Sequence, residues 1–261
     1  MSAAPPARFS KQTVRPTIEV CVEGVDGLVA AQEGGADRVE LCASLLEGGL
    51  TPSMGVIRAA LTSATIPIHV IVRPTGGDFL YTGLEFDSMV VDVETCRGLG
   101  IAGVVFGCLT ADGRIDADRM RILAEEARPM SVTCHRAFDM ARDFEEAIEA
   151  LIDCGIDRVL TSGQRDQALD GIETLRQTVQ LAGERIIVMG CGGLDASNIA
   201  EVRRRAGLSE MHFAALATRP SAMTFRNEHV GMGGAGHARE YESIVTDSDA
   251  VREIIAAARA S

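Results

Sequence analysis

The chain has 261 residues, of which 46% are hydrophobic and 24% charged, a balance typical of a globular protein in water. Its formal net charge is −12, so neither nucleic acid nor an anionic membrane surface is expected as a partner. No apolar run reaches the roughly 18 residues that a membrane-spanning helix needs. These features favour a cytoplasmic protein.

The cysteines give further information about the cellular compartment. All seven, at positions 21, 42, 96, 108, 134, 154 and 191, lie far apart in the sequence, and none forms a CxxC pair. A structural zinc site is therefore not expected, and the thiols should stay free in a reducing cytosol.

Short β-branched segments alternate with longer amphipathic segments from Thr17 onward, which predicts alternating strands and helices. The predicted strands are Thr17–Val22, Arg38–Cys42, Ile66–Val72, Gly103–Cys108, Ser131–Arg136, Arg158–Thr161, Arg185–Gly190 and Glu210–Ala215. The predicted helices include Gly24–Glu33, Met54–Thr62, Phe86–Leu99, Ala117–Ala127, Phe144–Asp153, Gly171–Ala182 and Ala196–Ala206.

Eight strands that alternate with helices over about 250 residues predict an α/β fold, a single-domain (β/α)8 TIM barrel over residues 17–261. A doubly wound sheet is the rival, but it usually has fewer strands and a Gly-rich first turn. Residues 1–16 lack the apolar segment of a secretion signal and are predicted to form a flexible tail. In such a barrel, the site is expected at the C-terminal ends of the strands.

Two neighbouring strands each carry a Glu followed two residues later by a Cys: Glu19 with Cys21, and Glu40 with Cys42. Side chains two residues apart in a strand point to the same face. A carboxylate inside a barrel needs a cation or hydrogen bonds, so the cluster is either a structural ion network or a functional site. The functional interpretation is favoured, because barrel interiors are usually filled with Val, Ile and Leu. The candidate catalytic residues at the strand ends are Glu19, Glu40, Arg73, His135 and His212.

The two cysteines suggest a metal site. If the two strands pair in step, Cys21 and Cys42 present both sulfurs to one soft ion, and thiolates select Cu(I) and zinc over hard cations. A cysteine pair without His or carboxylate ligands suits Cu(I) better than tetrahedral zinc. On spacing alone the alternative is stronger, since a buried free cysteine often serves as a small hydrophobic residue.

Two other strand ends are polar or glycine-rich. In VTCHRAFDM, His135 is a candidate general acid or base, while Arg136 is a candidate partner for Asp139 or for an anionic ligand. In MGCGGLDASNI, the backbone N–H groups of Gly192 and Gly193 are candidates for binding an anion, although a tight turn explains the glycines equally well. GMGGAGHA contains a G-x-G-x-x-G pattern but follows no predicted strand, so a flexible loop is expected there.

The strings IEVCVE, GGADRVELCASLLEGGLTPS, RPTGGDFLY, TCHRAFDM and RVLTSG together resemble the copper homeostasis protein family CutC. The resemblance runs from about Thr17 to His212, and no family motif is found after Ala217. It implies a TIM barrel, a cytosolic homodimer and Cu(I) binding. Cys21 and Cys42 stand where the proposed copper ligands of the family fall.

Three functions therefore remain open. The first is a copper homeostasis protein that binds Cu(I) through Cys21 and Cys42. The second is a TIM-barrel enzyme that acts on a small anionic metabolite, for instance a phosphorylated one, with a Glu/Arg/His site. The third is a scaffold with an inactive site. The two acids favour keeping the second, because a pair of thiols does not explain them.

Overall fold

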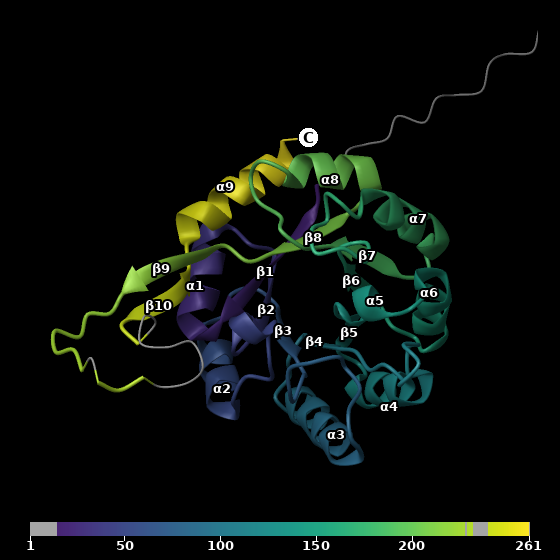
Figure 1. Cartoon of the computed structure of the whole chain (residues 1–261), viewed down its shortest axis with the longest axis horizontal. Coiled ribbons are helices and arrows are strands. Elements are labelled where there is room, and N and C mark those ends of the chain that lie inside the picture. The colour runs from purple at the N-terminus through teal and green to yellow at the C-terminus, as the bar shows by residue number, and fades with distance from the viewer. Residues whose placement is uncertain (1–14, 228, 232–239, 261) are drawn as a thin grey trace, which may run out of the picture.

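The computed structural model describes residues 15–227, 229–231 and 240–260. Eight parallel strands close into a barrel in chain order, with the helices around the outside (Figure 1). The barrel strands are β1 (Thr17–Glu23), β2 (Arg38–Cys42), β3 (Ile68–Ile71), β4 (Gly103–Phe106), β5 (Ser131–Cys134), β6 (Arg158–Thr161), β7 (Ile187–Gly190) and β8 (Glu210–Phe213). The predicted TIM barrel is confirmed.

The helices follow the strands as expected for β/α units. They are α1 (Gly24–Gly34), α2 (Met54–Ser63), α3 (Gly83–Gly98), α4 (Ala117–Ala127), α5 (Ala137–Met140), α6 (Phe144–Asp153), α7 (Ile172–Ala182), α8 (Ile199–Ala206) and α9 (Ser248–Arg259), with a 3-10 turn η1 (Leu45–Glu47). None of the described helices is long and apolar enough to cross a bilayer.

Local signals fix where several helices begin. α3 starts with a capping box, in which the Thr82 side chain accepts from the Glu85 N–H and the Glu85 carboxylate accepts from the Thr82 N–H. The carboxylate of Asp143 caps α6 in the same position. Such caps satisfy N–H groups that have no partner within the helix, so each helix begins at a defined residue.

Four strands end earlier than predicted: β3 at Ile71, β4 at Phe106, β5 at Cys134 and β8 at Phe213. Arg73 and His135 therefore lie in the first residues of the loops that follow β3 and β5. Pro74 cannot donate to a strand ladder, and α5 begins two residues after His135. The loops thus place both side chains at the mouth of the barrel.

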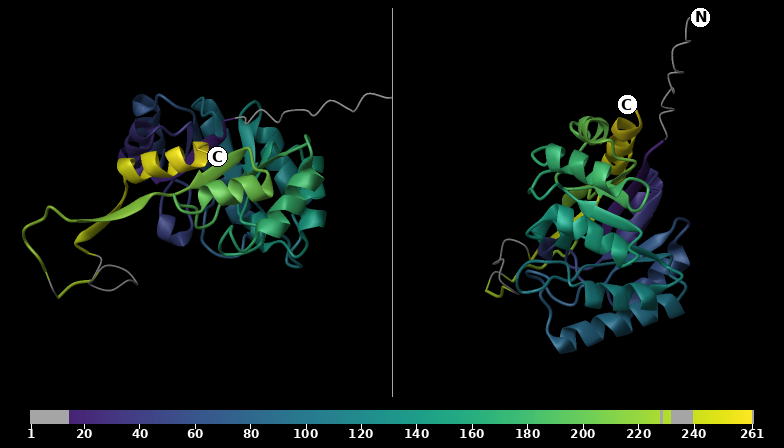
Figure 2. Two further views of the ribbon diagram at one scale, coloured as in Figure 1. Left: turned by 90° about the horizontal axis from the view of Figure 1, so that it is seen from above. Right: turned by 90° about the vertical axis from the view of Figure 1, so that its right-hand side faces the viewer.

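A C-terminal addition was not predicted. β9 (Leu216–Pro220) and β10 (Glu242–Thr246) pair as an antiparallel ribbon that projects from the barrel (Figures 1 and 2). α9 then packs beside α1, where a Cβ atom on Gly34 would lie 2.3 Å from Val251 Cγ1. Most of the GMGGAGHA segment and residues 1–14 of the predicted tail lie outside the described residues.

Candidate functional site

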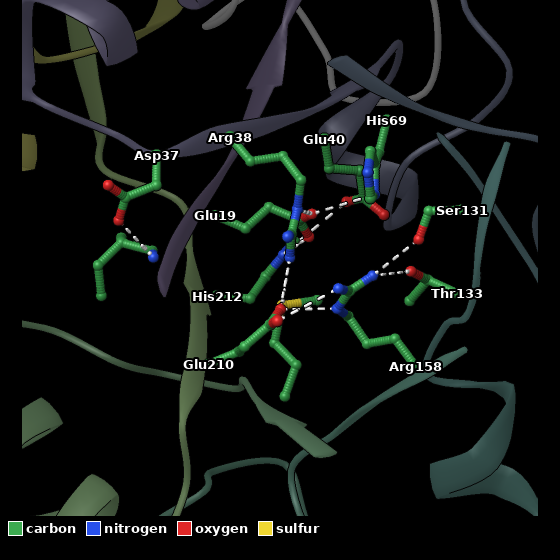
Figure 3. Close-up of polar contacts among 12 residues, drawn as sticks. Glu19, Asp37, Arg38, Glu40, His69, Ser131, Thr133, Arg158, Glu210 and His212 are labelled. Atoms are coloured by element: carbon green, nitrogen blue, oxygen red, sulfur yellow. Dashed lines mark hydrogen bonds and ion pairs between the residues drawn. The ribbon is translucent and has the colours of Figure 1, made fainter. Parts of the chain in front are cut away.

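The N-terminal half of the barrel interior holds a network of buried ion pairs (Figure 3). Arg38 Nε lies 2.5 Å from Glu19 Oε2, and its Nη2 lies 2.7 Å from Glu210 Oε2. Arg158 binds Glu210 through both Nε, at 2.6 Å, and Nη2, at 3.2 Å. Arg158 also donates to two hydroxyl groups on β5, those of Ser131 and Thr133. Each charge is paired and hydrogen-bonded, as a buried charge must be.

His212 lies between the ion-pair network and Glu40, which is closer to the mouth of the barrel. Its Nδ1 lies 2.8 Å from Glu19 Oε1, and its Nε2 lies 3.7 Å from Glu40 Oε2. Burial opposes charge on Glu19, but Arg38 and His212 hold its pKa well below the usual range. Burial also disfavours the His212 cation, yet the two glutamates raise its pKa overall. Burial, reinforced by the charge of Glu19, instead raises the pKa of Glu40. The two acids therefore differ: the pKa of Glu19 is lowered and that of Glu40 is raised.

A second buried histidine lies on β3. His69 Nδ1 is 3.6 Å from Glu19 Oε2, outside hydrogen-bonding distance, and burial lowers the pKa of His69 to about 4. Gly103 faces it on β4, where a Cβ atom would lie 2.5 Å from His69 Nε2. The glycine therefore provides the space for an uncharged imidazole in the barrel.

The thiols lie one layer above. Cys21 pairs in register with Glu40, and Cys42 pairs with Glu23, so the two strands are staggered rather than in step. The sulfurs of Cys21 and Cys42 are nevertheless 3.4 Å apart, because a tilted barrel strand brings diagonal neighbours together. The Cys21 thiol also donates to Glu40 Oε2 at 3.1 Å. Its hydrogen bond to Cys42, its burial and the nearby Glu40 all raise the pKa of Cys21.

These three residues form the one group of metal-ligand type found in the described part of the chain. One ligand atom each from Cys21, Glu40 and Cys42 lies within 4.8 Å of the others, and all three residues are buried. The carboxylate changes the expectation from sequence, since a cysteine pair with an acid beside it fits Cu(I) and also suits zinc. The residues present thus fit a soft metal ion.

A cavity of about 330 Å³ opens above the thiols at the mouth of the barrel. Of the residues predicted from sequence, the cavity wall includes Cys21, Glu40, Arg73, His135, Arg136, Gly192, Gly193 and His212. Glu19 is not part of the cavity wall and contacts His212, while Cys42 contacts Cys21. The structure therefore brings the predicted residues together, with eight on one cavity and two directly behind it.

One side of the mouth is formed by the ends of β3 and β5. Arg73 and His135 are 6% and 4% exposed, and the Phe79 ring lies against both. Burial lowers the pKa of His135 to about 3, with the Arg73 cation as the second cause. His135 is therefore a neutral imidazole at physiological pH.

The opposite side is formed by the ends of β6 and β7. Arg136 Nε binds Asp139 at 2.8 Å, as the sequence suggested, and its Nη2 donates to Ser162 Oγ at 2.7 Å. Gly192 and Gly193 have φ of 93° and 63°, values that favour glycine. A Cβ atom on Gly192 would lie 2.7 Å from Ser162 Cβ, so the turn passes close to the β6 loop.

The buried polar residues below the cavity were not predicted from the sequence. They are Arg38, His69, Arg158 and Glu210, and none was among the predicted site residues because those were taken from the C-terminal ends of the strands. Each of these lies two residues from another inward-facing or strand-end position, so the same two-residue alternation would have found them. Phe79 carried no signal in the sequence.

Comparison with known proteins identifies the family of the chain. The family model for the CutC family matches residues 16–217, which is most of the chain and ends where the recognised motifs end. The chain belongs to the CutC family. It is 62% identical over 252 residues to a CutC family protein from Mesorhizobium japonicum, covering 97% of this chain and 98% of the relative. It is 44% identical over 242 residues to the human copper homeostasis protein cutC homolog, covering 93% and 89%.

One solved structure agrees with this assignment, and a second shares only the fold. A crystal structure of a copper homeostasis protein CutC from Streptococcus agalactiae has a TM-score of 0.72 at 31% identity, covering 76% of this chain and 98% of that one. An N-(5'-phosphoribosyl)anthranilate isomerase from Pyrococcus furiosus has a TM-score of 0.54 at 16% identity, covering 94% of this chain and 100% of its own. The second likeness shows the shared barrel fold alone.

Proposed function

We propose that this protein binds Cu(I) in the cytosol through the sulfurs of Cys21 and Cys42. The observation that carries the proposal is the pair of buried sulfurs, 3.4 Å apart, with Cys21 on the wall of an open cavity. Membership of the CutC family, in which relatives are named copper homeostasis proteins, supports it. Thiolate ligands favour Cu(I) over hard cations, so copper here is cargo held by the protein.

Glu40 has a distinct part in this proposal. Its Oε2 accepts a hydrogen bond from the Cys21 thiol, so the carboxylate is placed to take the proton that the thiol loses when the metal binds. The same carboxylate makes zinc the natural competitor. Copper and zinc must therefore be compared on the same protein.

The test is a titration with Cu(I) under anaerobic, reducing conditions against a competing chelator. We expect one Cu(I) per chain, with the affinity of Cys21→Ser and Cys42→Ser reduced by about a hundredfold or more. Cys154→Ser is the matched control, because Cys154 is buried away from the cavity and its thiol donates to the Ala117 carbonyl, which a hydroxyl can also do. The control should bind as the wild type does.

Two outcomes would contradict the copper proposal. One is Cu(I) binding that the Cys21 and Cys42 variants leave unchanged. The other is zinc binding that is tighter than Cu(I) binding under the same conditions. Circular dichroism of each variant checks that the barrel is intact, so that a loss of binding is assigned to the thiol.

A single domain over residues 17–261 and a homodimer belong to the same proposal. The β9–β10 ribbon exposes apolar side chains, Leu216 at 46% and Ile244 at 37%, and a two-stranded ribbon alone in water is only marginally stable. A second copy of the chain would cover these side chains. Sedimentation equilibrium should give twice the chain mass, and Ile244→Glu should shift the protein toward the monomer.

The second candidate function is an enzyme that acts on a small anionic metabolite. Two unpartnered buried atoms on the cavity residues favour it, Glu40 Oε1 and His135 Nε2. In this proposal Glu40 and His212 exchange a proton with the substrate, while Glu19 holds His212 in place. Glu40→Gln should abolish turnover of any substrate found by metabolite screening, while Cys42→Ser should leave turnover largely intact.

A further inference from the structure

Arg73 is a buried cation without an acid. It is 6% exposed and forms no salt bridge with any described carboxylate, unlike Arg38 and Arg158 in the same barrel. Its Nη1 donates to the carbonyls of Glu47 and Gly49, and its Nη2 donates to a third carbonyl, that of Gly77. A guanidinium has five N–H groups, so two of them, including that of Nε, remain without an acceptor.

The neighbouring groups do not supply the missing negative charge. Tyr81 has its hydroxyl near Arg73 but makes no aligned hydrogen bond, and burial raises its pKa, so it stays neutral. Buried charges in proteins are normally paired. An anion bound in the cavity beside Arg73 would provide that charge.

His135 adds a third donor on the same side. Its Nδ1 accepts a hydrogen bond from the Ala137 N–H at 3.2 Å, so in the neutral ring the proton is assigned to Nε2. That Nε2–H has no acceptor in the described part of the chain. These three donors are unused, and no described carboxylate forms a salt bridge with Arg73, so an acceptor-only partner suits the site. A carboxylate is such a partner.

The Phe79 ring contacts both Arg73 and His135. The Arg73 guanidinium carbon lies 4.9 Å from the centre of the Phe79 ring, and the His135 ring lies 4.7 Å from it. Phe79 has a φ of 67°, a backbone conformation that a bulky side chain rarely adopts and that tends to occur at functional sites. The ring therefore packs against the side chains of both Arg73 and His135 at some cost in backbone strain.

The opposite wall offers a second anion site. β3 and β7 are four strands apart in the closed eight-stranded barrel, so the residues that follow them face each other across the cavity. The N–H groups of Gly192 and Gly193 make no hydrogen bond within the described residues. Arg136, which follows β5 and is paired with Asp139, reaches this side of the cavity through its hydrogen bond to Ser162. Backbone N–H groups after the seventh strand, with an arginine beside them, suit a phosphate group.

We propose that the cavity binds a small molecule with a carboxylate at one end and a phosphate at the other, of the class of phosphorylated sugar acids. The carboxylate is held by Arg73 and His135 under Phe79, and the phosphate by the Gly192–Gly193 turn. This inference deepens the second proposed function, because it names the ligand class of that site. It does not depend on copper.

Calorimetry on the copper-free protein tests the proposal. The probes are 3-phosphoglycerate and 6-phosphogluconate, which differ in length. Each is compared with the matching phosphate without a carboxylate (glycerol 3-phosphate, sorbitol 6-phosphate) and with the acid without a phosphate (glycerate, gluconate). We expect at least one phosphorylated acid to bind about tenfold or more tightly than both of its truncated forms.

Variants then test whether Arg73 binds the carboxylate of the ligand. Arg73→Gln should weaken binding of the phosphorylated acid by about tenfold or more and change binding of the alcohol phosphate by less than about twofold. Arg58→Gln is the matched control, since Arg58 is exposed on α2 and lies outside the cavity wall. It should bind every probe as the wild type does.

Three results would overturn the proposal. They are no binding of either phosphorylated acid at millimolar concentration, equal affinity for an acid and its alcohol phosphate, and an equal loss for all probes in Arg73→Gln. The last would mean that Arg73 only anchors the loop after β2. The comparison of probes on the wild type stands even if Arg73→Gln fails to fold. If neither phosphorylated acid binds, the copper proposal still stands, because the copper titration tests it separately. The enzyme proposal also stands if the protein turns over a substrate of another class.

Discussion

Replacing Arg38 by Met removes the cation that lies between two buried acids. Arg38 is 7% exposed and lies 2.5 Å from a Glu19 oxygen and 2.7 Å from a Glu210 oxygen. Glu210 keeps Arg158 as a partner in the variant. Glu19 keeps only His212 within hydrogen-bonding distance, so the main electrostatic loss falls on Glu19.

The expected loss follows from the pairing. Removing one partner of a buried ion pair costs about 3–5 kcal/mol, because the other charge is left uncompensated. Met has a similar length and fills most of the space, and His212 still offsets part of the charge. We therefore expect the free energy of unfolding to fall by about 3 kcal/mol at neutral pH, the lower end of that range.

The sign of the pH dependence is set by the acids. Arg38 lowers the pKa of both Glu19 and Glu210. An acid whose pKa is lower in the folded state than its unfolded value near 4.3 stabilises the fold above that unfolded value. This stabilisation is lost as the pH falls through the folded pKa. In the variant, only the two histidines offset the burial of Glu19, so Glu19 takes up a proton at higher pH. The difference from the wild type should therefore narrow as the pH falls toward about 4.

Urea denaturation followed by circular dichroism, at neutral pH and near pH 4.5, measures both effects. Arg58→Met is the control for losing an arginine from an exposed helix position, and it should change stability by less than about 0.5 kcal/mol. The reasoning fails if Arg38→Met costs less than about 1 kcal/mol at neutral pH, or if the loss is the same at both pH values.

Three further predictions concern single positions. Gly103→Ala would place a Cβ atom 2.5 Å from His69 Nε2 and should cost about 1–3 kcal/mol in thermal denaturation, partly recovered by adding His69→Ala. Cu(I) affinity, measured by chelator competition, should rise about tenfold per pH unit for each proton released, because the Cys21 thiol must lose its proton to bind; a flat profile would exclude thiolate binding. Asp139→Asn weakens the acceptor for both the N–H and the hydroxyl of Ser162, so limited proteolysis should cut the β6–α7 loop faster than in the wild type; an unchanged rate would show that this carboxylate does not order the loop.

The sequence predicted the barrel because its evidence is local and repeated. β-branched runs, helix caps and the alternation of strand and helix each point to the same fold. The ribbon of β9 and β10 has no such signal, since its two strands pair across more than twenty intervening residues. α9 was missed with it, although its apolar face, with Val251 and Ile255 buried, has the helical period.

The site was predicted in its residue types and only partly in its geometry. The two-residue spacing correctly put Glu19 and Cys21 inside the barrel, but the pairing of Cys21 with Glu40 depends on the stagger between strands. That stagger is a property of the closed barrel and cannot be read from either strand alone. The ion pair of Arg38 with Glu210 likewise depends on closure, since β8 returns to pair with β1, the strand beside β2.

Two identical motifs end in different electrostatic environments, and this difference links the two proposals. Glu19 is held ionised by Arg38 and lies behind the cavity, whereas Glu40 has a raised pKa and lies on the cavity wall beside Cys21. A ligand that spans the cavity would lie over Cys21, so it must change access to the thiols.

By linkage, any ligand that weakens copper binding is itself bound more weakly by the copper-loaded protein, and by the same factor. Cu(I) affinity measured with and without saturating 6-phosphogluconate, and the reverse titration, should therefore give equal shifts. A shift in one direction alone would indicate competition for copper by the sugar acid in solution. No shift in either direction would place the two ligands at independent sites.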